Sequence, residues 1–355
     1  TDHGTFQAPP DSHSRGNFLG GEEGNDLSAR LGVFGATGYS GREIVRLLRQ
    51  HPQAGVSFTT GSGGGHLDHE AGLDAAADAY LLALPHGVAA RYAARLREAH
   101  PDAVVVDLSG DLRLPDTEAY TRWYGQEHPA PELLGRAVFG LPEVYRDRLR
   151  GARLVSNPGC YATSVLLPLV PLLRGGLVDP DDLVADAKSG ASGAGRSPKE
   201  SLLFCEVTDD FSAYSPGRSH RHVGEVEAVL KDTTGHDLEL TFCPHLLPVK
   251  RGILTALHVR TDRPPDVLAT ALRTAYEGAP FVHVVEAPPR LGDVALTNDC
   301  RISVHPAASG RAVVFSAIDN LVKGAAGQAI QNLNLAMGWE EGAGLPSAFG
   351  PDGVA

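Results

Sequence analysis

Residues 31–41, Leu31-Gly32-Val33-Phe34-Gly35-Ala36-Thr37-Gly38-Tyr39-Ser40-Gly41, decide the fold of this chain. The first four form a short apolar run typical of a fully buried strand, and three glycines then recur at intervals of three residues. Residues 42–50 follow with Ile44, Leu47 and Leu48 on one helical face. A strand, a glycine turn and a helix in this order indicate a dinucleotide site. Glycines admit a pyrophosphate close to the backbone, and the helix start offers free N–H groups.

The spacing of these glycines is G-x-x-G-x-x-G rather than G-x-G-x-x-G. A tight turn that holds no ligand is therefore the alternative interpretation. If the turn does hold a cofactor, the residues that we expect to contact it are Gly35, Thr37, Gly38, Tyr39, Ser40 and Gly41.

The pattern of strand and helix continues after this unit. An apolar strand at 79–84 precedes a helix at 88–100, and another apolar strand follows at 103–107. This alternation predicts an α/β fold of Rossmann type, with a doubly wound parallel sheet. Ligands bind such sheets at the carboxyl ends of the strands, which brings Pro85 and His86 near a cofactor. For His86, packing within its own loop is an equally good explanation.

The end of the second strand, 56–60, bears on the choice of cofactor. An Asp or Glu there would bind the adenosine ribose 2′-hydroxyl and select NAD, and the sequence has neither. Thr59 and Ser62 provide hydroxyl groups without negative charge, and Arg42 is a candidate partner for a 2′-phosphate. The sequence therefore favours NADP over NAD.

Length and composition exclude several classes of protein. The 355 residues suffice for two domains, and 42% hydrophobic with 21% charged residues is ordinary for a soluble globular chain. The net charge of −12 disfavours nucleic acid as a partner. The longest apolar run, 164–173, contains two prolines and is too short to span a membrane. The four cysteines lie far apart, which argues against a zinc site or a disulfide framework and indicates a reducing, cytoplasmic location.

The ends of the chain have no helical or strand periodicity. Residues 1–28 are polar and glycine-rich and lack the apolar segment of a secretory signal, so we expect a disordered N-terminal extension. Residues 341–355 are rich in glycine and proline, so we expect a loose tail.

The alternating strand–helix pattern ends at one stretch, Ser156-Asn157-Pro158-Gly159-Cys160-Tyr161-Ala162-Thr163. An apolar strand, 153–155, precedes it and a long aliphatic run follows. Asn157 is a good N-cap and Pro158 suits a first helical turn, which puts Cys160 at or near a helix start. The N–H groups and positive dipole end there favour the thiolate, the reactive form of cysteine. A small buried hydrophobe is the alternative interpretation of Cys160.

Beyond Cys160 the sequence indicates an α+β domain with long loops. Small residues at 189–195 followed by Arg196 could form a backbone anion site, or simply a flexible linker. His220 and His222 could be surface histidines, acid–base residues or, as the weakest interpretation, metal ligands. Lys250-Arg251 could bind a carboxylate or phosphate, or lie in a solvated turn. The glycine-rich start of the last helix, 320–324, could also take a ligand, and we expect this helix to pack on the first domain.

A dinucleotide fold, a cysteine at a helix start and a nearby histidine together indicate one chemistry. The thiolate would attack an activated acyl carbon to give a thioester, a nicotinamide would supply hydride, and the histidine would protonate the oxygen. At this point the chain resembles the N-acetyl-γ-glutamyl-phosphate reductase family, which is related to aspartate-semialdehyde dehydrogenase. The resemblance covers about residues 30–338 and rests on GATGYSG (35–41), LPHG (84–87), VVDLSGDLRL (105–114), GLPEVYR (140–146), SNPGCYAT (156–163), KSGASGAGR (188–196), HRH (220–222), FCPHLLPVKRGIL (242–254), TNDC (297–300) and NLVKGAAGQAIQNLN (320–334).

The resemblance implies roles for particular residues. Cys160 would be the nucleophile and His220 the acid–base residue, with His222 close enough in sequence to exchange roles with it. Substrate or phosphate would be bound by Ser189, Ser192, Arg196, Arg113, His222 and Arg251. NADP would be held by the glycine turn together with Asn320, Lys323, Gly324 and Gln328.

The implied activity is the NADPH-dependent reduction of N-acetyl-L-glutamyl 5-phosphate to the 5-semialdehyde and phosphate, a step of arginine biosynthesis. The implied architecture is an NADP-binding domain of residues 29–157 plus 320–340 and a catalytic and oligomerisation domain of residues 158–319, in a homodimer or homotetramer. One alternative is the reduction of carrier-protein-bound aminoadipyl phosphate in lysine biosynthesis, which the charge of −12 disfavours because the carrier is itself acidic. Another alternative is a non-catalytic NADP-binding sensor.

Two stretches depart from the family pattern. The segment 61–74 is short and glycine-rich, where the family usually has a longer stretch that often contains an arginine. Arg218-Ser219 also stands where the family usually has glycine before the HRH motif.

Overall fold

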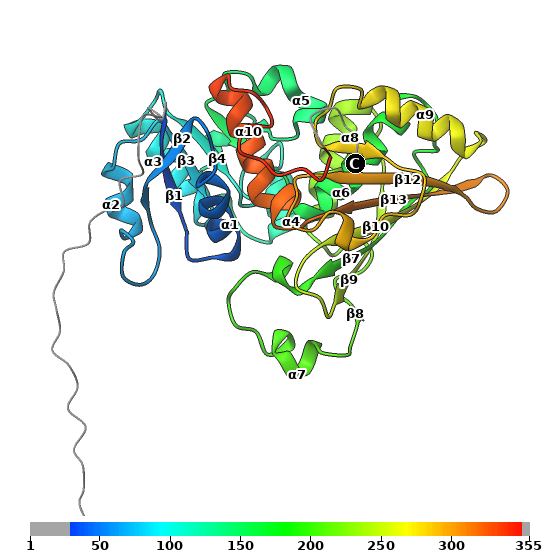
Figure 1. Ribbon diagram of the computed structural model, residues 1–355, viewed down its shortest axis with the longest axis horizontal. Coiled ribbons are helices and arrows are strands. Elements are labelled where there is room, and N and C mark those ends of the chain that lie inside the picture. Colours follow the sequence, from blue (N-terminus) through cyan, green and yellow to red (C-terminus); the bar gives the residue numbers. More distant parts are fainter. Residues whose placement is uncertain (1–28, 350–355) are drawn as a thin grey trace, which may run out of the picture.

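The structure, a computed structural model, describes residues 29–349 (Figure 1). The expected N-terminal extension, 1–28, and the last residues of the expected tail, 350–355, lie outside the described residues.

The first half of the chain forms the predicted parallel sheet. Its six strands lie in the order β2-β1-β3-β4-β6-β5, and every neighbouring pair is parallel. The order reverses between β1 and β3, which is where a doubly wound sheet binds ligands. The strands are β1 Ala29–Phe34, β2 Ala54–Thr59, β3 Ala79–Leu82, β4 Val104–Asp107, β5 Val138–Phe139 and β6 Leu154–Ser156.

Helices cover both faces of this sheet because its strands are apolar on both sides. Leu31 and Val33 of β1 face a core that includes Ile44 of α1, whereas Phe34 faces a second core that includes Leu96 of α3. The helices of this half are α1 Tyr39–Leu48, α2 His69–Asp74, α3 Ala89–Ala99, α4 Thr117–Tyr124 and α5 Pro142–Leu149, with a 3₁₀ turn at Pro131–Leu133.

The second half forms a seven-stranded mixed sheet in the order β11-β12-β13-β10-β7-β9-β8. Helices α6, α8 and α9 pack on it around one large apolar core. The strands are β7 Leu183–Gly190, β8 Ser212–Ala213, β9 Leu240–Leu247, β10 Ile253–Arg260, β11 Val282–Val284, β12 Cys300–Pro306 and β13 Arg311–Ile318. The helices are α6 Cys160–Arg174, α7 Phe204–Val207, α8 His222–Thr234 and α9 Pro265–Ala275, with 3₁₀ turns at Ala191–Ala194, Glu200–Leu202 and Leu291–Asp293.

The chain crosses between the two sheets twice. It leaves the parallel sheet after β6 and enters the mixed sheet through α6. It returns after β13 through a π-helical turn, Val322–Ala326, that leads into α10, Gly327–Met337 (Figure 1). Ile330 and Leu333 of α10 share a core with α1 and the parallel sheet, so the packing expected for this helix is confirmed.

The described part of the C-terminal segment, 341–349, is not the loose tail that its composition suggested. The Glu341 side chain is buried, pairs with Arg146 and accepts a hydrogen bond from Gln331 Nε2 at 2.8 Å. The backbone carbonyls of Glu341 and Ala343 accept from Asn334 Nδ2. Buried amides on α10 need such partners, and the segment supplies them without any regular secondary structure. Within residues 29–349 no helix is both long and apolar enough to cross a membrane.

Candidate active site

Cys160 is the first residue of α6, as the sequence predicted, but the cap of this helix is different. Gly159, in extended conformation, is the N-cap, and Asn157 does not cap the helix. The Asn157 N–H donates to the Asp107 carbonyl at 2.7 Å and so continues the ladder of β6, which delays the turn by two residues. The Asn157 side chain instead accepts from Asn332 Nδ2 at 2.9 Å and donates to the Ala325 carbonyl at 3.2 Å.

The thiol of Cys160 is in an environment that opposes its ionisation. Burial raises its pKa to about 11, although the charge of Arg113 and the N–H groups of Tyr161 and Cys160 act in the other direction. The N–H groups at the helix start do lower the pKa of Cys160, as expected, but desolvation raises it by more. The sulfur must therefore lose its proton to a neighbouring base before it can act as a nucleophile.

A buried group of charged side chains supports the turn that precedes Cys160. Glu225 accepts the Gly159 N–H at 2.7 Å and also pairs with Arg113 at 3.2 Å. Arg113 Nη1 lies 3.5 Å from His222 Nε2, and a Cβ on Gly159 would come within 2.4 Å of that same nitrogen. The His222 ring therefore lies directly against the turn that presents Cys160, and only glycine fits at position 159.

The Arg113 guanidinium is held by several partners inside the chain. Besides Glu225, it donates to the carbonyls of Asn157 and Leu108, both at 2.8 Å. The side chain is also almost completely buried. These contacts engage Nε and both terminal nitrogens of the guanidinium, and the substrate contact expected for Arg113 stays a prediction.

Both histidines of the HRH motif lie beside the start of α6 and are held neutral. Burial, followed by the charge of Arg221, lowers the pKa of His220 to about 4. Burial lowers the pKa of His222 well below its ordinary value, and the nearby charges of Arg113 and Arg221 act in the same direction. The backbone N–H of His222 lies 3.2 Å from Nδ1 of His220. The two rings lie 4.7 Å apart, and His222 Nδ1 has no partner among residues 29–349.

The small-residue loop after β7 is held in place and is not a free linker. Asn320 donates to Ser192 Oγ at 3.0 Å and accepts the Gly252 N–H at 2.7 Å. Ser189 is buried and donates to the Gly190 carbonyl. Arg196 leaves this loop and donates to the Thr37 carbonyl of the glycine turn at 2.8 Å. The loop thus joins the two halves of the site.

Arg251 also joins the two halves, but through carboxylates. Its guanidinium lies 3.0 Å from Asp319 and 3.4 Å from Glu43 of α1, and its side chain is 15% exposed. Two carboxylates meet its charge, so the structure gives it partners other than the substrate that was expected for it.

The glycine turn has the geometry that the sequence predicted for a cofactor site. Gly35 has φ +76°, and a Cβ on Gly41 would lie 2.3 Å from the Gly35 carbonyl oxygen. The turn continues through Gly38, the N-cap of α1, into Tyr39 and Ser40 at the helix start. Glycine at these positions permits the tight turn and lets the backbone approach a pyrophosphate closely.

The other residues expected around a cofactor lie at the neighbouring strand ends. Thr59 Oγ1 is 2.7 Å from Nδ1 of His66, a histidine that sequence reasoning did not single out, and Ser62 is exposed. Pro85 and His86 follow β3, and the His86 ring packs on Tyr124 at 5.6 Å. His86 Nδ1 is also 3.4 Å from Arg221, so His86 contacts both α4 and the HRH motif.

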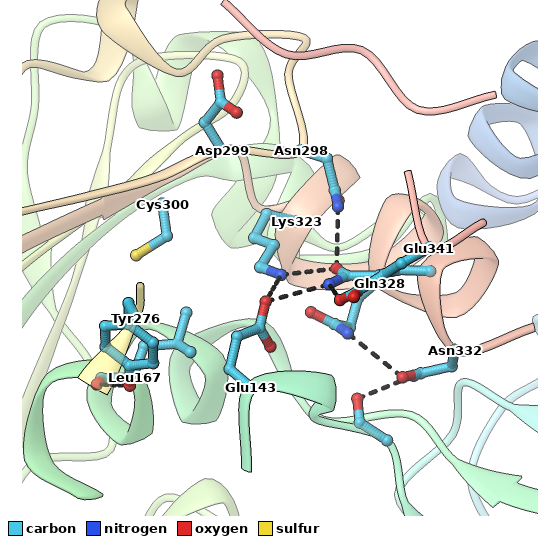
Figure 2. Close-up of polar contacts among 12 residues, drawn as sticks. Glu143, Leu167, Tyr276, Asn298, Asp299, Cys300, Lys323, Gln328, Asn332 and Glu341 are labelled. Atoms are coloured by element: carbon cyan, nitrogen blue, oxygen red, sulfur yellow. Dashed lines mark hydrogen bonds and ion pairs between the residues drawn. The ribbon is translucent and has the colours of Figure 1, made fainter. Parts of the chain in front are cut away.

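The residues expected to bind cofactor from the last helix start have mixed positions. Gly324 lies against Cys160 and Asn320 contacts Ser192. Figure 2 shows the Lys323 side chain directed toward Glu143. Lys323 Nζ is 2.7 Å from both Glu143 Oε1 and Gln331 Oε1, and the Lys323 and Glu143 side chains are fully buried. Gln328 is likewise buried and donates to Asn332 at 3.4 Å. The ammonium group of Lys323 thus lies in an internal ion pair, and its role toward a cofactor stays a prediction.

Comparisons with known proteins agree with this architecture. The family described as semialdehyde dehydrogenase, NAD binding domain, matches residues 30–152, and the one described as semialdehyde dehydrogenase, dimerisation domain, matches residues 160–320. N-acetyl-gamma-glutamyl-phosphate reductase of Halorhodospira halophila is 45% identical over 337 residues, 89% of this chain and 97% of that protein. The protein of the same name from Pseudomonas aeruginosa is 45% identical over 342 residues, 90% of this chain and 98% of its own. The chain belongs to the N-acetyl-gamma-glutamyl-phosphate reductase family.

Solved structures of more distant proteins have the same fold. Aspartate semialdehyde dehydrogenase II of Vibrio cholerae, complexed with ASA, matches with a TM-score of 0.65 at 16% identity and covers 87% of this chain and 98% of its own. Aspartate semialdehyde dehydrogenase of Candida albicans, solved with NADP, matches with a TM-score of 0.58 at 17% identity, over 87% and 98%.

Sequence reasoning missed three contributors to the site of this reductase family member. Glu225 lies three residues after His222 on one face of α8, a spacing that could have indicated its link to the motif. Tyr214 donates to the Tyr161 hydroxyl at 2.9 Å and packs on His220, and no local pattern announced it. Asn332 reaches Asn157 from α10, which only the tertiary packing reveals. Within residues 29–349 no cluster of three or more His, Cys, Asp or Glu side chains could hold a metal ion.

Proposed function

We propose that this chain catalyses the NADPH-dependent reduction of N-acetyl-L-glutamyl 5-phosphate to N-acetyl-L-glutamate 5-semialdehyde and phosphate, in arginine biosynthesis. The observation that carries the proposal is Cys160 at the tip of α6, with His222 against its turn. The 45% identity with relatives named for this reaction supports it over the carrier-protein substrate and over a sensor without turnover.

The first step uses Cys160 and an imidazole. A neutral ring of the His220–His222 pair takes the thiol proton, which the raised pKa of Cys160 makes necessary. The sulfur then forms a bond to the acyl carbon, the bond from that carbon to the phosphate oxygen breaks, and phosphate leaves with the electron pair. The product on the enzyme is a thioester of Cys160.

The second step reduces the thioester and regenerates the free thiol of Cys160. NADPH, when bound at the glycine turn, supplies the hydride that the thioester carbon accepts. The carbon–sulfur bond then breaks, and the protonated imidazole gives its proton back as the aldehyde and the free thiol form. The buried Arg113–Glu225 pair keeps the Gly159 turn in place throughout, because Glu225 holds the N–H next to Cys160.

We assign proton transfer to His220, with His222 as its exchangeable neighbour. His220 is half-buried beside Tyr161, whereas His222 is buried beside the Arg113 charge, where an imidazolium would be repelled. The variants His220→Asn and His222→Asn separate the two roles. Replacing the residue that carries the proton directly should lower kcat strongly and change KM little.

Arg196 and Ser192 are the remaining candidates for the substrate's phosphate or carboxylate. Arg196 is exposed and at the junction of the two halves, whereas Arg113 and Arg251 each pair with a buried carboxylate within the chain. We therefore give Arg196 the anion-binding role that the resemblance had shared among three arginines.

The reverse reaction tests the proposal. Phosphate-dependent oxidation of N-acetyl-L-glutamate 5-semialdehyde should require NADP and proceed poorly with NAD. Cys160→Ser should lower kcat at least ~10³-fold, because the covalent route disappears with its nucleophile. The matched control is Cys205→Ser, which changes an exposed cysteine of α7 and should keep full activity. Turnover by Cys160→Ser within tenfold of the wild type would refute the mechanism.

A further inference from the structure

Arg221, the middle residue of the HRH motif, is an exposed arginine at the junction of the two halves. It directly precedes α8 in the chain. Its Nη1 lies 3.4 Å from Nδ1 of His86, in the loop after β3, and its guanidinium carbon lies 5.9 Å from the centre of the Tyr124 ring of α4. Arg221 therefore reaches from the mixed-sheet half to the carboxyl end of the parallel sheet, where ligands bind.

The positive charge of Arg221 has no counter-ion in the chain. Arg218, three residues earlier, pairs with Glu227 at 2.5 Å, whereas Arg221 forms no ion pair within residues 29–349. Its contact in the other half is the His86 ring, whose pKa is lowered by burial and by the charge of Arg221. A neutral imidazole can accept a hydrogen bond from a guanidinium. His86 thus directs the cation without neutralising it.

The charge of Arg221 reaches the imidazoles of the HRH motif. After burial, it is the next cause that lowers the pKa of His220, and it acts in the same direction on His222. Arg113, the other cation beside these rings, pairs with Glu225. A charge that repels a proton from the two rings attracts an anion to the same place, and only that of Arg221 is left uncompensated there.

We propose that Arg221 binds the phosphate group of the acyl-phosphate substrate, with His86 as its positioning residue. This assignment rests on the proposed function. The phosphate is bonded to the carbon that Cys160 attacks, so it lies beside the imidazole that serves Cys160, and Arg221 directly follows His220. When the carbon–oxygen bond breaks, phosphate takes the electron pair, and a guanidinium stabilises that charge through two parallel hydrogen bonds. Arg196 is then left for the carboxylate of the substrate.

The kinetic test varies inorganic phosphate in the reverse reaction. Arg221→Gln should raise the KM for phosphate at least ~10-fold and leave the KM values for NADP and for the semialdehyde within about twofold. Arg221→Lys keeps the charge without the planar fork and should recover part of the loss. The control is Arg122→Gln, which changes an exposed arginine of α4 and should leave all three KM values unchanged.

Two kinetic outcomes would overturn the assignment. One is an unchanged KM for phosphate in Arg221→Gln, even if kcat falls, because Arg221 would then act only on the histidines. The other is a rise in the KM for the semialdehyde alone, which would make Arg221 the ligand of the carboxylate.

The role of His86 has its own variant. His86→Ala removes the ring that directs Arg221 and should raise the KM for phosphate about threefold or more, with the KM for NADP unchanged. A rise in the KM for NADP alone would overturn the positioning role.

A binding measurement needs no turnover. At equal ionic strength, replacing sodium chloride by about 50 mM sodium phosphate should raise the Tm of the wild type and of Arg122→Gln by about 2 °C more than that of Arg221→Gln, because a ligand bound only by the folded state stabilises it. The general stabilisation by phosphate, through its exclusion from protein surfaces, is common to all three proteins. Equal Tm shifts would overturn the proposal. Because no substrate turns over, failure here is distinct from failure of the proposed reaction.

Discussion

Two glycine-containing helix starts meet at the centre of this molecule. The ionisable groups beside one are neutral, whereas those beside the other form a buried ion pair. Cys160 opens α6, and Gly324 lies in the π-helical turn before α10; a Cβ on Gly324 would be only 2.7 Å from that of Cys160. At the first start the thiol and both imidazoles are held neutral by burial. At the second start a lysine remains buried with a carboxylate against it (Figure 2).

The difference comes from the neighbours and not from the local sequence. Both stretches have the glycine and small residues of a ligand-binding helix start. Lys323, however, meets Glu143 from α5 and Gln331 from α10, whereas the side of α6 that bears Cys160 faces two histidines. A helix start therefore indicates where a ligand can bind, and the packed elements around it decide whether one does.

The largest effect that would test this comparison is expected at Lys323. Lys323→Met leaves Glu143 as an uncompensated buried charge, which should lower the free energy of unfolding by about 3–5 kcal/mol. Urea denaturation measures it. Lys231→Met, which removes an exposed lysine of α8, is the control and should change stability by no more than about 0.5 kcal/mol.

A second variant distinguishes an internal ion pair from a cofactor ligand at Lys323. Lys323→Met with Glu143→Gln removes both charges and should recover most of the lost stability. This double variant should also bind NADP within about twofold of the wild type, measured by titration calorimetry, because the Lys323 ammonium group is bound to Glu143 and Gln331. A tenfold loss of NADP affinity in the refolded double variant would restore the original expectation of a cofactor contact.

The low pKa of His220 predicts that the free energy of unfolding depends on pH, an effect of intermediate size. The pKa of His220 is about 4 in the folded chain and near 6.5 when unfolded, so the unfolded state binds more protons between these values. Stability is therefore full above about pH 6.5 and is lost as the pH falls toward 4. Between pH 7.5 and 5, urea denaturation should show the wild type losing about 2 kcal/mol more than His220→Gln.

Exposed His258 of β10 serves as the control for that measurement. His258→Gln should follow the wild-type pH dependence. Parallel curves for the wild type and His220→Gln would mean that His220 is already charged in the folded protein, and the contrast between the two helix starts would be lost.

The smallest effect is expected where the two starts touch. Gly324→Ala adds a methyl group 2.7 Å from Cys160 Cβ and should lower kcat about tenfold by displacing the thiol. Gly292→Ala adds the same group in open space and should leave kcat unchanged. The rate of Cys160 alkylation, followed beside kcat, shows whether the thiol itself has moved; an unaltered rate and kcat would mean that this contact is not tight.

Much of the fold follows from sequence because its signals are local. The run Leu31–Phe34, the glycine turn and the apolar strands after it specify parallel strands buried on both faces, and the structure confirms them. The position of Cys160 at a helix start was predictable for the same reason. The order of the mixed sheet was not, since its pairings join segments as distant as Ser189 and Ile253.

The sequence predicted which residues lie near the candidate site better than it predicted which partners their side chains contact. Arg113, Arg251 and Lys323 were expected to bind ligands, which stays a prediction; in the structure each pairs with a carboxylate that is distant in sequence. Those carboxylates lie 68 to 180 residues away in sequence, so no local pattern contains the information. Burial had a similar effect on Cys160, where desolvation outweighs a dipole that the sequence does show.

Because the chain passes twice between its two sheets, the position of these passages affects how one half of the molecule can rotate against the other. The passages at 157–160 and 319–327 run side by side, joined by the bond from Asn157 to the Ala325 carbonyl and by the contact of Gly324 with Cys160. Two adjacent connections define an axis, and bodies that rotate about an axis move least where it passes. Rotation of one half against the other would carry Thr37 away from Arg196 and open the glycine turn, while the sulfur stayed nearly still. Cofactor exchange and a fixed nucleophile are thereby compatible in one chain.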